Sequence, residues 1–302
     1  DDEFKARVRL RPGQPYRGDA VTETAKAFSE LFGAYGYAFA RVEPRPEIDR
    51  ARGLVVVTLA AEPQRRVYVR RIDVSGNTRT RDEVVRREFR QIESSWYDGS
   101  RIKLSRDRVD RLGYFNEVNV ETAEVPGAPD QVDLTVAVAE KPTGNLLIGA
   151  SYSNAEKLGL SASIRQDNVF GSGNYLGIEL NTSSSNRTLV VSAVDPYFTV
   201  DGISRGIDLY YRTMRPFNSL GDEYQISTPG GSVRFGVPVT DFDTVYLGLG
   251  AESTRIGSSS GIPNSYYLYR QTYGASSFSL PLTLGWARDS RDSAIVPTRG
   301  RV

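Results

Sequence analysis

Hydrophobic and polar side chains alternate along most of the second half of the chain. Between residues 145 and 286, about eight segments place an apolar residue at every second position and are separated by polar links. A period of two is typical of β-strands with one polar and one apolar face. The clearest apolar series are Leu146, Ile148, Ala150 and Tyr152; Leu158, Leu160, Ala162 and Ile164; Ile207, Leu209 and Tyr211; Val245, Leu247, Leu249 and Ala251; and Leu280, Leu282, Leu284 and Trp286.

The polar positions of these strands distinguish two all-β architectures. In a soluble β-sandwich the polar face meets water and is usually rich in charged side chains. Here the polar face is mainly Gly, Ser, Asn and Thr, and the apolar face is aliphatic with aromatic ends such as Tyr152, Tyr211 and Trp286. An apolar band with aromatic girdles around a polar interior is typical of a transmembrane β-barrel. The pattern favours a barrel, and a soluble sandwich that acts as a binding module stays as an alternative.

The links between the predicted strands also differ in length. If the first strand runs outward, the long links at 214–223 and 257–276 fall on the far side, whereas the near-side links are short, as in outer-membrane barrels. Two proline-containing segments fit poorly. Pro281 lies inside a predicted strand, and Pro229-Gly230-Gly231 is expected to break the start of another.

The first half of the chain has a mixed periodicity that includes helices. Residues 19–35 repeat apolar residues at helical spacing and predict an amphipathic helix that ends at Gly36. Strands are predicted at 37–42 and 54–59, joined by a turn at Pro44-Arg45-Pro46.

Residues 67–138 repeat this order more completely. The pattern predicts a strand at 67–74, a helix at 80–90 that begins with a capping box of Thr80 and Glu83, a helix at 100–115, and strands at 118–123 and 132–138. The order β-α-α-β-β fits a small module, and residues 4–62 fit the same unit without its first strand.

Lys141-Pro142-Thr143-Gly144 marks the boundary between the two patterns. Residues 1–142 contain 25 Lys/Arg, 24 Asp/Glu and 9 Gly, whereas residues 143–302 contain 13, 13 and 19. We therefore predict a partial α+β module at 1–63, a complete module at 64–142, and about half of an antiparallel β-barrel at 143–302.

The composition argues against several classes of function. The chain has no Cys and no His, so disulfides, thiolate metal sites and Ser-His or Cys-His catalytic pairs are impossible within it. A net charge of +1 gives no reason to expect nucleic acid as a partner. No apolar run is long enough for a transmembrane helix, and no signal segment stands at Asp1. We expect no cofactor, no metal and no nucleotide, and an enzyme is the weakest hypothesis.

Two short motifs have ordinary structural interpretations. Gly171-Ser172-Gly173 is a tight strand connection rather than a phosphate-binding loop, because no helix and no complete glycine motif follow. The carboxylates of Asp289 and Asp292 could suggest acid–base chemistry. Arg288 and Arg291 would neutralise them, which favours a polar rim of the barrel.

Two segments are candidates for protein contacts. Arg86, Arg90 and Glu93 lie at a predicted helix end, where a solvated surface and a docking surface for a partner are both possible. The first predicted barrel strand lacks its closing partner in this chain, and an open edge in lipid leaves backbone groups unpaired. That edge is either an ordinary closed seam or a site that pairs with another strand. Its residues are Asn145, Leu146, Leu147, Ile148, Gly149, Ala150, Ser151, Tyr152 and Ser153.

The sequence resembles the BamA family of outer-membrane protein assembly factors, in which POTRA modules precede a bacterial surface antigen barrel. The segment from YVRRIDVSGNTRT to VAEKPTG resembles the last POTRA module and its join to the barrel. QDNVFGSGNYLG, DPYFTVDG and WARDSRD…PTRG resemble early barrel strands and turns, and FGAYGYAFARVEPRPEID resembles the end of the penultimate POTRA module. The earlier modules, the second half of the barrel and a surface loop with an Arg-Gly-Phe signature do not occur in this chain.

The resemblance implies a function that the pattern alone does not. Such proteins fold and insert other β-barrels into the bacterial outer membrane, with their POTRA modules in the periplasm and without a nucleotide. The resemblance implies that residues 145–153 form a lateral gate for the terminal strand of an unfolded client. It also implies that Arg86, Arg90 and Glu93 dock an accessory lipoprotein. A POTRA-barrel secretion pore of the two-partner type is the alternative function.

Overall fold

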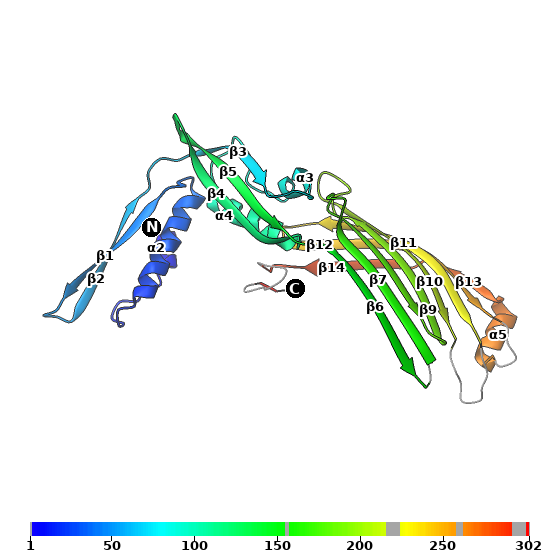
Figure 1. The fold of residues 1–302 in the computed structure, drawn as a ribbon. Helices are drawn as coiled ribbons and strands as arrows, with labels where there is room; N and C mark the ends of the chain where they lie inside the picture. Colours follow the sequence, from blue (N-terminus) through cyan, green and yellow to red (C-terminus); the bar gives the residue numbers. More distant parts are fainter. Residues whose placement is uncertain (1, 155–156, 216–223, 258–261, 292–299, 302) are drawn as a thin grey trace. The chain divides into compact units, whose positions relative to one another are not determined.

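The computed structural model describes residues 2–154, 157–215, 224–257, 262–291 and 300–301 of the chain. The chain divides into two compact units, Asp1–Glu140 and Lys141–Val302. The first unit contains helices and short sheets, and the second is one large antiparallel sheet (Figure 1). Among the described residues, no helix has the length and apolar character needed to cross a membrane.

The first unit begins with an incomplete α+β module. Its elements are α1 (Asp2–Arg7), α2 (Gly18–Ala34), β1 (Arg41–Asp49) and β2 (Leu54–Glu62). The predicted helix is confirmed as α2, which buries Val21, Ala25 and Leu31 on one face as its helical spacing requires. Helix α1 was not predicted.

The prolines of this module do not form the predicted turn. Strand β1 begins at Arg41 and contains both Pro44 and Pro46, which pair with Leu59 and Val57 of β2. The turn instead lies at residues 50–53. The predicted strand at 37–42 was therefore placed too early. Proline is tolerated because β1 is an edge strand, where a missing N–H can face outward.

The second module of this unit has the predicted order β-α-α-β-β. It consists of β3 (Tyr68–Ser75), α3 (Asp82–Arg86), α4 (Gly99–Arg111), β4 (Phe115–Val125) and β5 (Ala128–Glu140). The strand order is β3-β5-β4, with β3 parallel and β4 antiparallel to the central β5. The helices cover this sheet with a core of fully buried side chains, each stabilising the fold by roughly 1.5–3 kcal/mol. The fully buried members are Val67, Val69, Val84, Val85, Val109, Phe115, Val132, Leu134 and Val136.

The helix boundaries of this module differ from the predicted ones. Thr80 does not cap α3, because the N-cap residue is Arg81 and its side chain makes no capping hydrogen bond. The Thr80 N–H donates to Glu140 Oε1 at 2.7 Å instead. The capping side chain that sequence analysis missed is Asp98, which accepts from the N–H groups of Ser100 and Arg101 at the start of α4.

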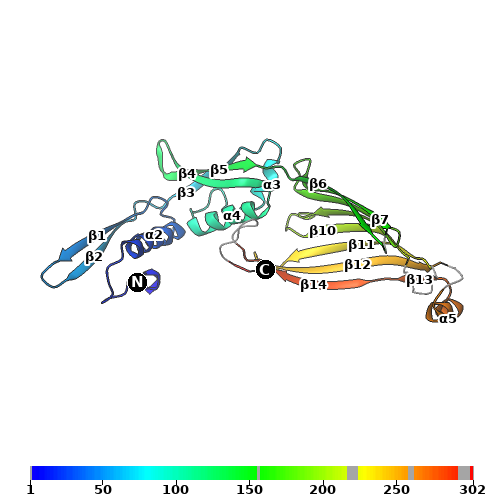
Figure 2. The same cartoon turned by 60° about the horizontal axis from the view of Figure 1, so that its bottom comes forward.

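The second unit is a single meander of antiparallel strands. In order along the sheet, each strand from β6 to β12 pairs with the next strand of the sequence, and both β13 and β14 pair with β12 (Figures 1 and 2). The elements are β6 (Gly144–Ser153), β7 (Lys157–Val169), β8 (Asn174–Thr182), β9 (Asn186–Asp195), β10 (Ser204–Met214), β11 (Ile226–Pro238), β12 (Asp243–Ile256), α5 (Asn264–Tyr273), β13 (Ser276–Ser279) and β14 (Leu282–Arg288).

Pro281 interrupts the sheet as predicted, whereas Pro229 does not. Pro281 separates β13 from β14, as its misfit in the strand pattern suggested. Pro229 does not break β11, which includes residues 229–231 and loses only its pairing to β12 at Thr228 and Pro229. Helix α5 was not predicted. The predicted far-side links fall partly on residues 155–156, 216–223 and 258–261, outside the described part of the chain.

Candidate functional site

The two faces of the sheet differ sharply in chemistry, and the apolar face is exposed. Ile148 is 79% exposed on β6, Leu249 is 59% exposed on β12, and Leu284 is 79% exposed on β14. The apolar residues are also cross-strand neighbours: Leu249 pairs with Val233 on one side and with Leu282 on the other. A continuous exposed aliphatic surface of this kind marks a lipid or protein contact. It contradicts the soluble sandwich, whose apolar face would be buried.

The opposite, polar face carries hydrogen bonds that connect several strands. Asp208 on β10 accepts from Ser192 on β9 at 2.6 Å and lies 3.9 Å from the guanidinium of Arg234 on β11. The Tyr210 hydroxyl reaches across β11 and donates to Glu252 on β12 at 2.8 Å. Asp208 is paired with a cation and Glu252 accepts from a neutral hydroxyl, so this part of the polar face is a hydrogen-bonded lining.

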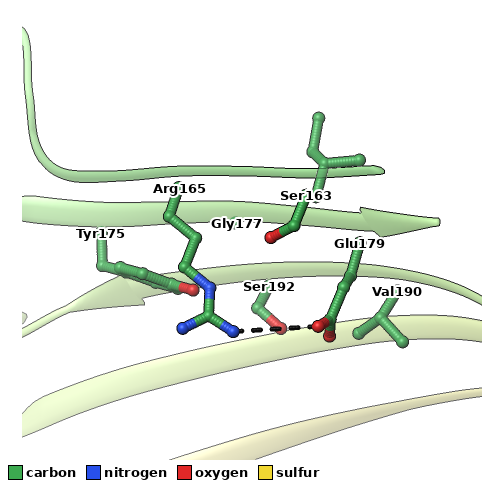
Figure 3. A pocket seen from close by; sticks show the side chains of 8 residues that line it. Ser163, Arg165, Tyr175, Gly177, Glu179, Val190 and Ser192 are labelled. Atoms are coloured by element: carbon green, nitrogen blue, oxygen red, sulfur yellow. Dashed lines mark ion pairs between the residues drawn. The ribbon is translucent and has the colours of Figure 1, made fainter. Parts of the chain in front are cut away.

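A small cavity of about 30 Å³ lies on this polar face. Figure 3 shows its ion pair, in which Arg165 of β7 and Glu179 of β8 approach to 3.8 Å, with Tyr175 and Ser192 beside them. Near the other end of the sheet, Arg291 binds Asp289 at 2.7 Å, as expected of a polar rim; Asp292 lies outside the described residues. The described residues hold no acidic cluster suited to a metal ion.

Strand β6 forms one end of the sheet. Residues 145–153 pair in antiparallel register with β7, from Asn145 opposite Arg165 to Ser153 opposite Lys157. In the part of the chain that the structure describes, β6 has no strand on its other side. Its backbone is therefore available along one edge for a closing strand or for another chain.

Apolar residues of β6 and β7 lie opposite one another, as in the register pairs of Leu146 with Ile164 and Ala150 with Leu160. The cross-strand bond from Ser161 Oγ to the Gly149 carbonyl is long, at 3.4 Å. Gly149 and Ser151 lie on the polar face of β6, whereas the Arg165–Glu179 pair joins β7 to β8. Strand β6 is thus joined to the rest of the sheet on one side only, through its backbone ladder and its side-chain neighbours on β7.

Two of the three predicted docking residues, Arg86 and Glu93, meet at the edge of β3. Glu93 Oε1 accepts the Ile72 N–H at 2.8 Å, and Arg86 Nη2 donates to the Ile72 carbonyl at 2.6 Å. Arg86 and Glu93 also form an ion pair of 3.4 Å and are each nearly half exposed. The Arg90 backbone N–H donates to Ser105 Oγ.

This edge of β3 is closed by side chains as well as by backbone. Residues 94–97 add a short antiparallel segment, in which the Ser94 N–H donates to the Val69 carbonyl at 2.7 Å and the Tyr97 N–H to the Val67 carbonyl at 3.0 Å. Arg86 and Glu93 continue that pairing to Ile72. Sequence reasoning identified the charges but not their contacts with the β3 backbone.

Glu140 fixes the loop before α3 to the end of β5. Its carboxylate accepts from the N–H groups of Arg79 and Thr80 and from the Thr78 hydroxyl at 2.9 Å. Partial burial raises the pKa of Glu140, but the hydrogen bonds from Thr80, Thr78 and Arg79 hold the pKa below its ordinary value. Gly76 in this loop has φ +85, and a Cβ there would lie 2.0 Å from the Val138 carbonyl oxygen.

Fold and surface together define a class: POTRA-type α+β modules joined to an open antiparallel sheet of the membrane-barrel kind. Residues 168–302 match the family model of the Omp85 superfamily domain. Residues 1–61 and 67–141 match the POTRA model, described as a surface antigen variable number repeat. The chain belongs to the Omp85 superfamily, whose outer-membrane assembly factors place their barrel in the bacterial outer membrane and their POTRA modules in the periplasm.

Sequence relatives carry the name outer membrane protein assembly factor BamA. The protein of Neisseria meningitidis serogroup B is 36% identical over 99% of this chain, and that of Nitratidesulfovibrio vulgaris is 29% identical over 97% of it. The chain spans only 39% and 36% of the lengths of these two relatives.

Solved structures show the same fold. BamA from Haemophilus ducreyi lacking POTRA domains 1–3 superimposes with a TM-score of 0.78 at 26% identity, over 99% of this chain and 58% of that one. CdiB from Escherichia coli has a TM-score of 0.50 at 14% identity, over 94% of this chain and 52% of that one, which indicates a shared fold alone.

Proposed function

We propose that this chain is part of an assembly factor that folds β-barrel proteins into the outer membrane, and that β6 is the strand on which a client's terminal strand pairs. The observation that carries the proposal is the position of β6 at the end of the sheet, where one of its edges pairs with no strand of the described part of the chain. In lipid, unpaired backbone groups cost several kcal/mol each, which favours the addition of a client strand. The BamA relatives support the assembly activity.

In this proposal, residues 1–63 are the penultimate POTRA module, residues 64–142 are the last, and residues 143–302 are the first half of the barrel. The Haemophilus ducreyi BamA, which lacks POTRA domains 1–3, supports that numbering. The second half of the barrel would provide the strand that closes against β6. Unfolded outer-membrane proteins are the proposed clients and accessory lipoproteins the proposed partners, with the surface of Arg86, Arg90 and Glu93 as a docking site.

An engineered disulfide tests the gate. The chain contains no cysteine, so a pair introduced into it meets no native thiol of this chain. In the full-length protein, one cysteine in β6 and one in the closing strand would lock the seam, and we expect client insertion into vesicles to stop until a reductant is added. A matched control, A150C with L160C, ties β6 to β7 at an existing register pair and leaves the outer edge free. Full insertion by the locked seam would refute the gate.

The secretion-pore alternative remains a prediction with weaker support. The similarity to CdiB extends to the fold only. The two sequence relatives that match nearly the whole of this chain are both named as assembly factors. The two functions can be distinguished by the proteins that depend on them. A secretion pore exports one partner protein, whereas an assembly factor inserts several unrelated barrels. Loss of a single exported protein, with normal levels of all other barrels after depletion, would favour the pore.

A further inference from the structure

One arginine lies on the apolar face of the sheet, beside two aromatic rings. The guanidinium carbon of Arg205 is 4.0 Å from the ring centroid of Phe198, and the rings of Phe198 and Phe235 are 6.2 Å apart. Phe198 and Phe235 are 45% and 37% exposed, so their rings are accessible from outside the sheet. This cluster takes no part in the proposed gate and goes beyond that function.

Strand register places Arg205 among the apolar residues. Every second residue of a strand lies on the same face, so Arg205 shares the exposed, apolar face of β10 with Ile207, Leu209 and Tyr211. Its cross-strand partner on β11 is Phe235, which lies on the same face as Val233 and Val237. A cation on a lipid-facing surface is costly unless its charge is neutralised or reaches the membrane surface.

The chain path places Arg205 at the near-side boundary of the apolar band. Arg205 is the second residue of β10, within about 3 Å of that strand's first residue along its axis. Successive strands of an antiparallel meander run in opposite directions. Strands β6, β8 and β10 therefore all start on the same side of the sheet. Because the POTRA module joins at the start of β6, this is the periplasmic side of the membrane.

The turn between β9 and β10 holds Phe198 in place. The Gly202 N–H donates to the Thr199 carbonyl at 3.0 Å and the Ile203 N–H donates to Thr199 Oγ1 at 3.2 Å. Gly202 has φ +84, which a side chain would strain. The aromatic ring is therefore presented by an ordered turn.

The neighbouring carboxylate of Asp195 forms no ion pair with Arg205 within 4.0 Å. Asp195 is the partner of Arg205 on β9, but its Oδ1 accepts the Tyr197 N–H at 3.1 Å and so forms the start of the turn. Within the described part of the chain, Arg205 takes part in the ring contact and in none of the ion pairs that lie within 4.0 Å. A guanidinium stacked on an aromatic ring keeps its edge N–H groups free to bind an anion.

We propose that Arg205, stacked on Phe198 beside Phe235, binds the phosphate group of a phospholipid in the periplasm-facing leaflet. The aromatic rings contact the glycerol and upper acyl region, where amphipathic and aromatic side chains concentrate in membrane proteins. The guanidinium donates to the phosphate oxygens, a pairing for which its planar geometry is well suited. The occupant is a lipid, because the face around the cluster is exposed and aliphatic, which suits acyl chains rather than water.

Native mass spectrometry of the full-length protein tests this site. Detergent-purified protein is titrated with dioleoylphosphatidylglycerol, and the lipids retained are counted for the native chain, R205Q and R205K. Loss of a charge-assisted contact predicts about tenfold weaker retention of the tightest-bound lipid in R205Q. R205K keeps the positive charge but loses the planar, stacked guanidinium, so its retention should lie between those of the native chain and R205Q.

Two comparisons separate a phosphate site from general lipid adhesion. R212Q removes an arginine that is also stacked on a ring, at 4.5 Å from Tyr210, but on the polar face of the same strand. Retention by R212Q should equal that of the native chain. Dioleoylglycerol, which lacks the phosphate, should bind the native chain and R205Q equally. Equal phosphatidylglycerol retention by the native chain and R205Q would overturn the proposal, whatever the activity of the gate.

Discussion

At the scale of single residues, Glu93 combines a proposed partner contact with a contact inside its own module. Its carboxylate holds the Ile72 N–H and pairs with Arg86, so charge reversal would disturb β3 as well as any docking. E93Q is a cleaner change, because the amide oxygen can still accept from Ile72 while the negative charge is lost.

We expect E93Q to reduce co-purification of an accessory lipoprotein severalfold while hydrogen exchange at Ile72 stays slow. E93A is the contrasting variant, because it loses both the acceptor and the charge, and exchange at Ile72 should become faster. Undiminished co-purification of E93Q would remove the docking role and leave Glu93 with its structural contact.

Glu140 gives a pH-dependent prediction at the same scale. Its lowered folded-state pKa means that its contribution to stability is present above the unfolded pKa of about 4.3 and is lost as the pH falls through the folded value. E140Q keeps an acceptor but loses the charge, so we expect a cost of about 1 kcal/mol at neutral pH. Hydrogen exchange of residues 76–81, measured at pH 7 and at acid pH, should become faster in E140Q and depend less on pH. Identical pH profiles of the two proteins would contradict this assignment.

At the scale of elements, tyrosine rings cover glycines on the polar face of the sheet. Tyr210 lies over its cross-strand partner Gly230, where an added Cβ would be 2.5 Å from the ring. Tyr246 lies over Gly236 in the same way, at 2.8 Å. These glycines are therefore required by the rings rather than by backbone conformation.

G230A should displace the Tyr210 ring and with it the hydrogen bond to Glu252. We expect a loss of about 1–3 kcal/mol, typical of overpacking, seen as a lower temperature for loss of the compact form on heat-modifiability gels. Y210F removes only the hydroxyl bond and is expected to have a smaller effect. If G230A melted like the native protein, the ring would not be fixed in this position.

Element types were easier to predict from sequence than element ends. The period of two identified the strands of the large sheet because side-chain alternation is a local property. The ends of α3 were missed because the Thr80 N–H binds Glu140, sixty residues away, instead of starting a capped helix. Helix α5 was missed because its tyrosines have no clear amphipathic spacing, although four of its ten residues are tyrosine.

The contact residues show the same limit. The edge position of β6 followed from its place as the first strand of a meander. The contacts of Arg86 and Glu93 with Ile72 depend on how the segment after α3 packs on β3, which no local pattern contains. Arg205 did leave a signal, since a charged residue stands at an apolar position of β10.

At the scale of the whole molecule, the orientation of the sheet in the membrane can be tested by two adjacent positions of β11. Val233 lies on the apolar face, and Ser232 lies on the polar face, 3.5 Å from Asp208. V233R places a charge in lipid two residues inside the boundary residue Phe235, so its cost should lie between the about 0–1 kcal/mol of the interface and the about 2–4 kcal/mol of the bilayer middle. S232R gains a neighbouring carboxylate and should be tolerated.

The folded fraction of each full-length variant in lipid vesicles, measured by heat modifiability, should fall for V233R and stay near the native value for S232R. Equal losses in both variants, or a greater loss in S232R, would mean that the lipid side and the lining side have been exchanged.

The two prolines of β1 have a consequence for the surroundings of the molecule. Pro44 and Pro46 share one side of the strand and carry no N–H, while the other side of β1 is occupied by β2. An extended polypeptide that approached the outer edge of β1 could donate to its carbonyl oxygens. It would receive no hydrogen bond at the two positions where proline lacks an N–H. This edge therefore resists the addition of further strands and the fibril-like stacking that would follow from it.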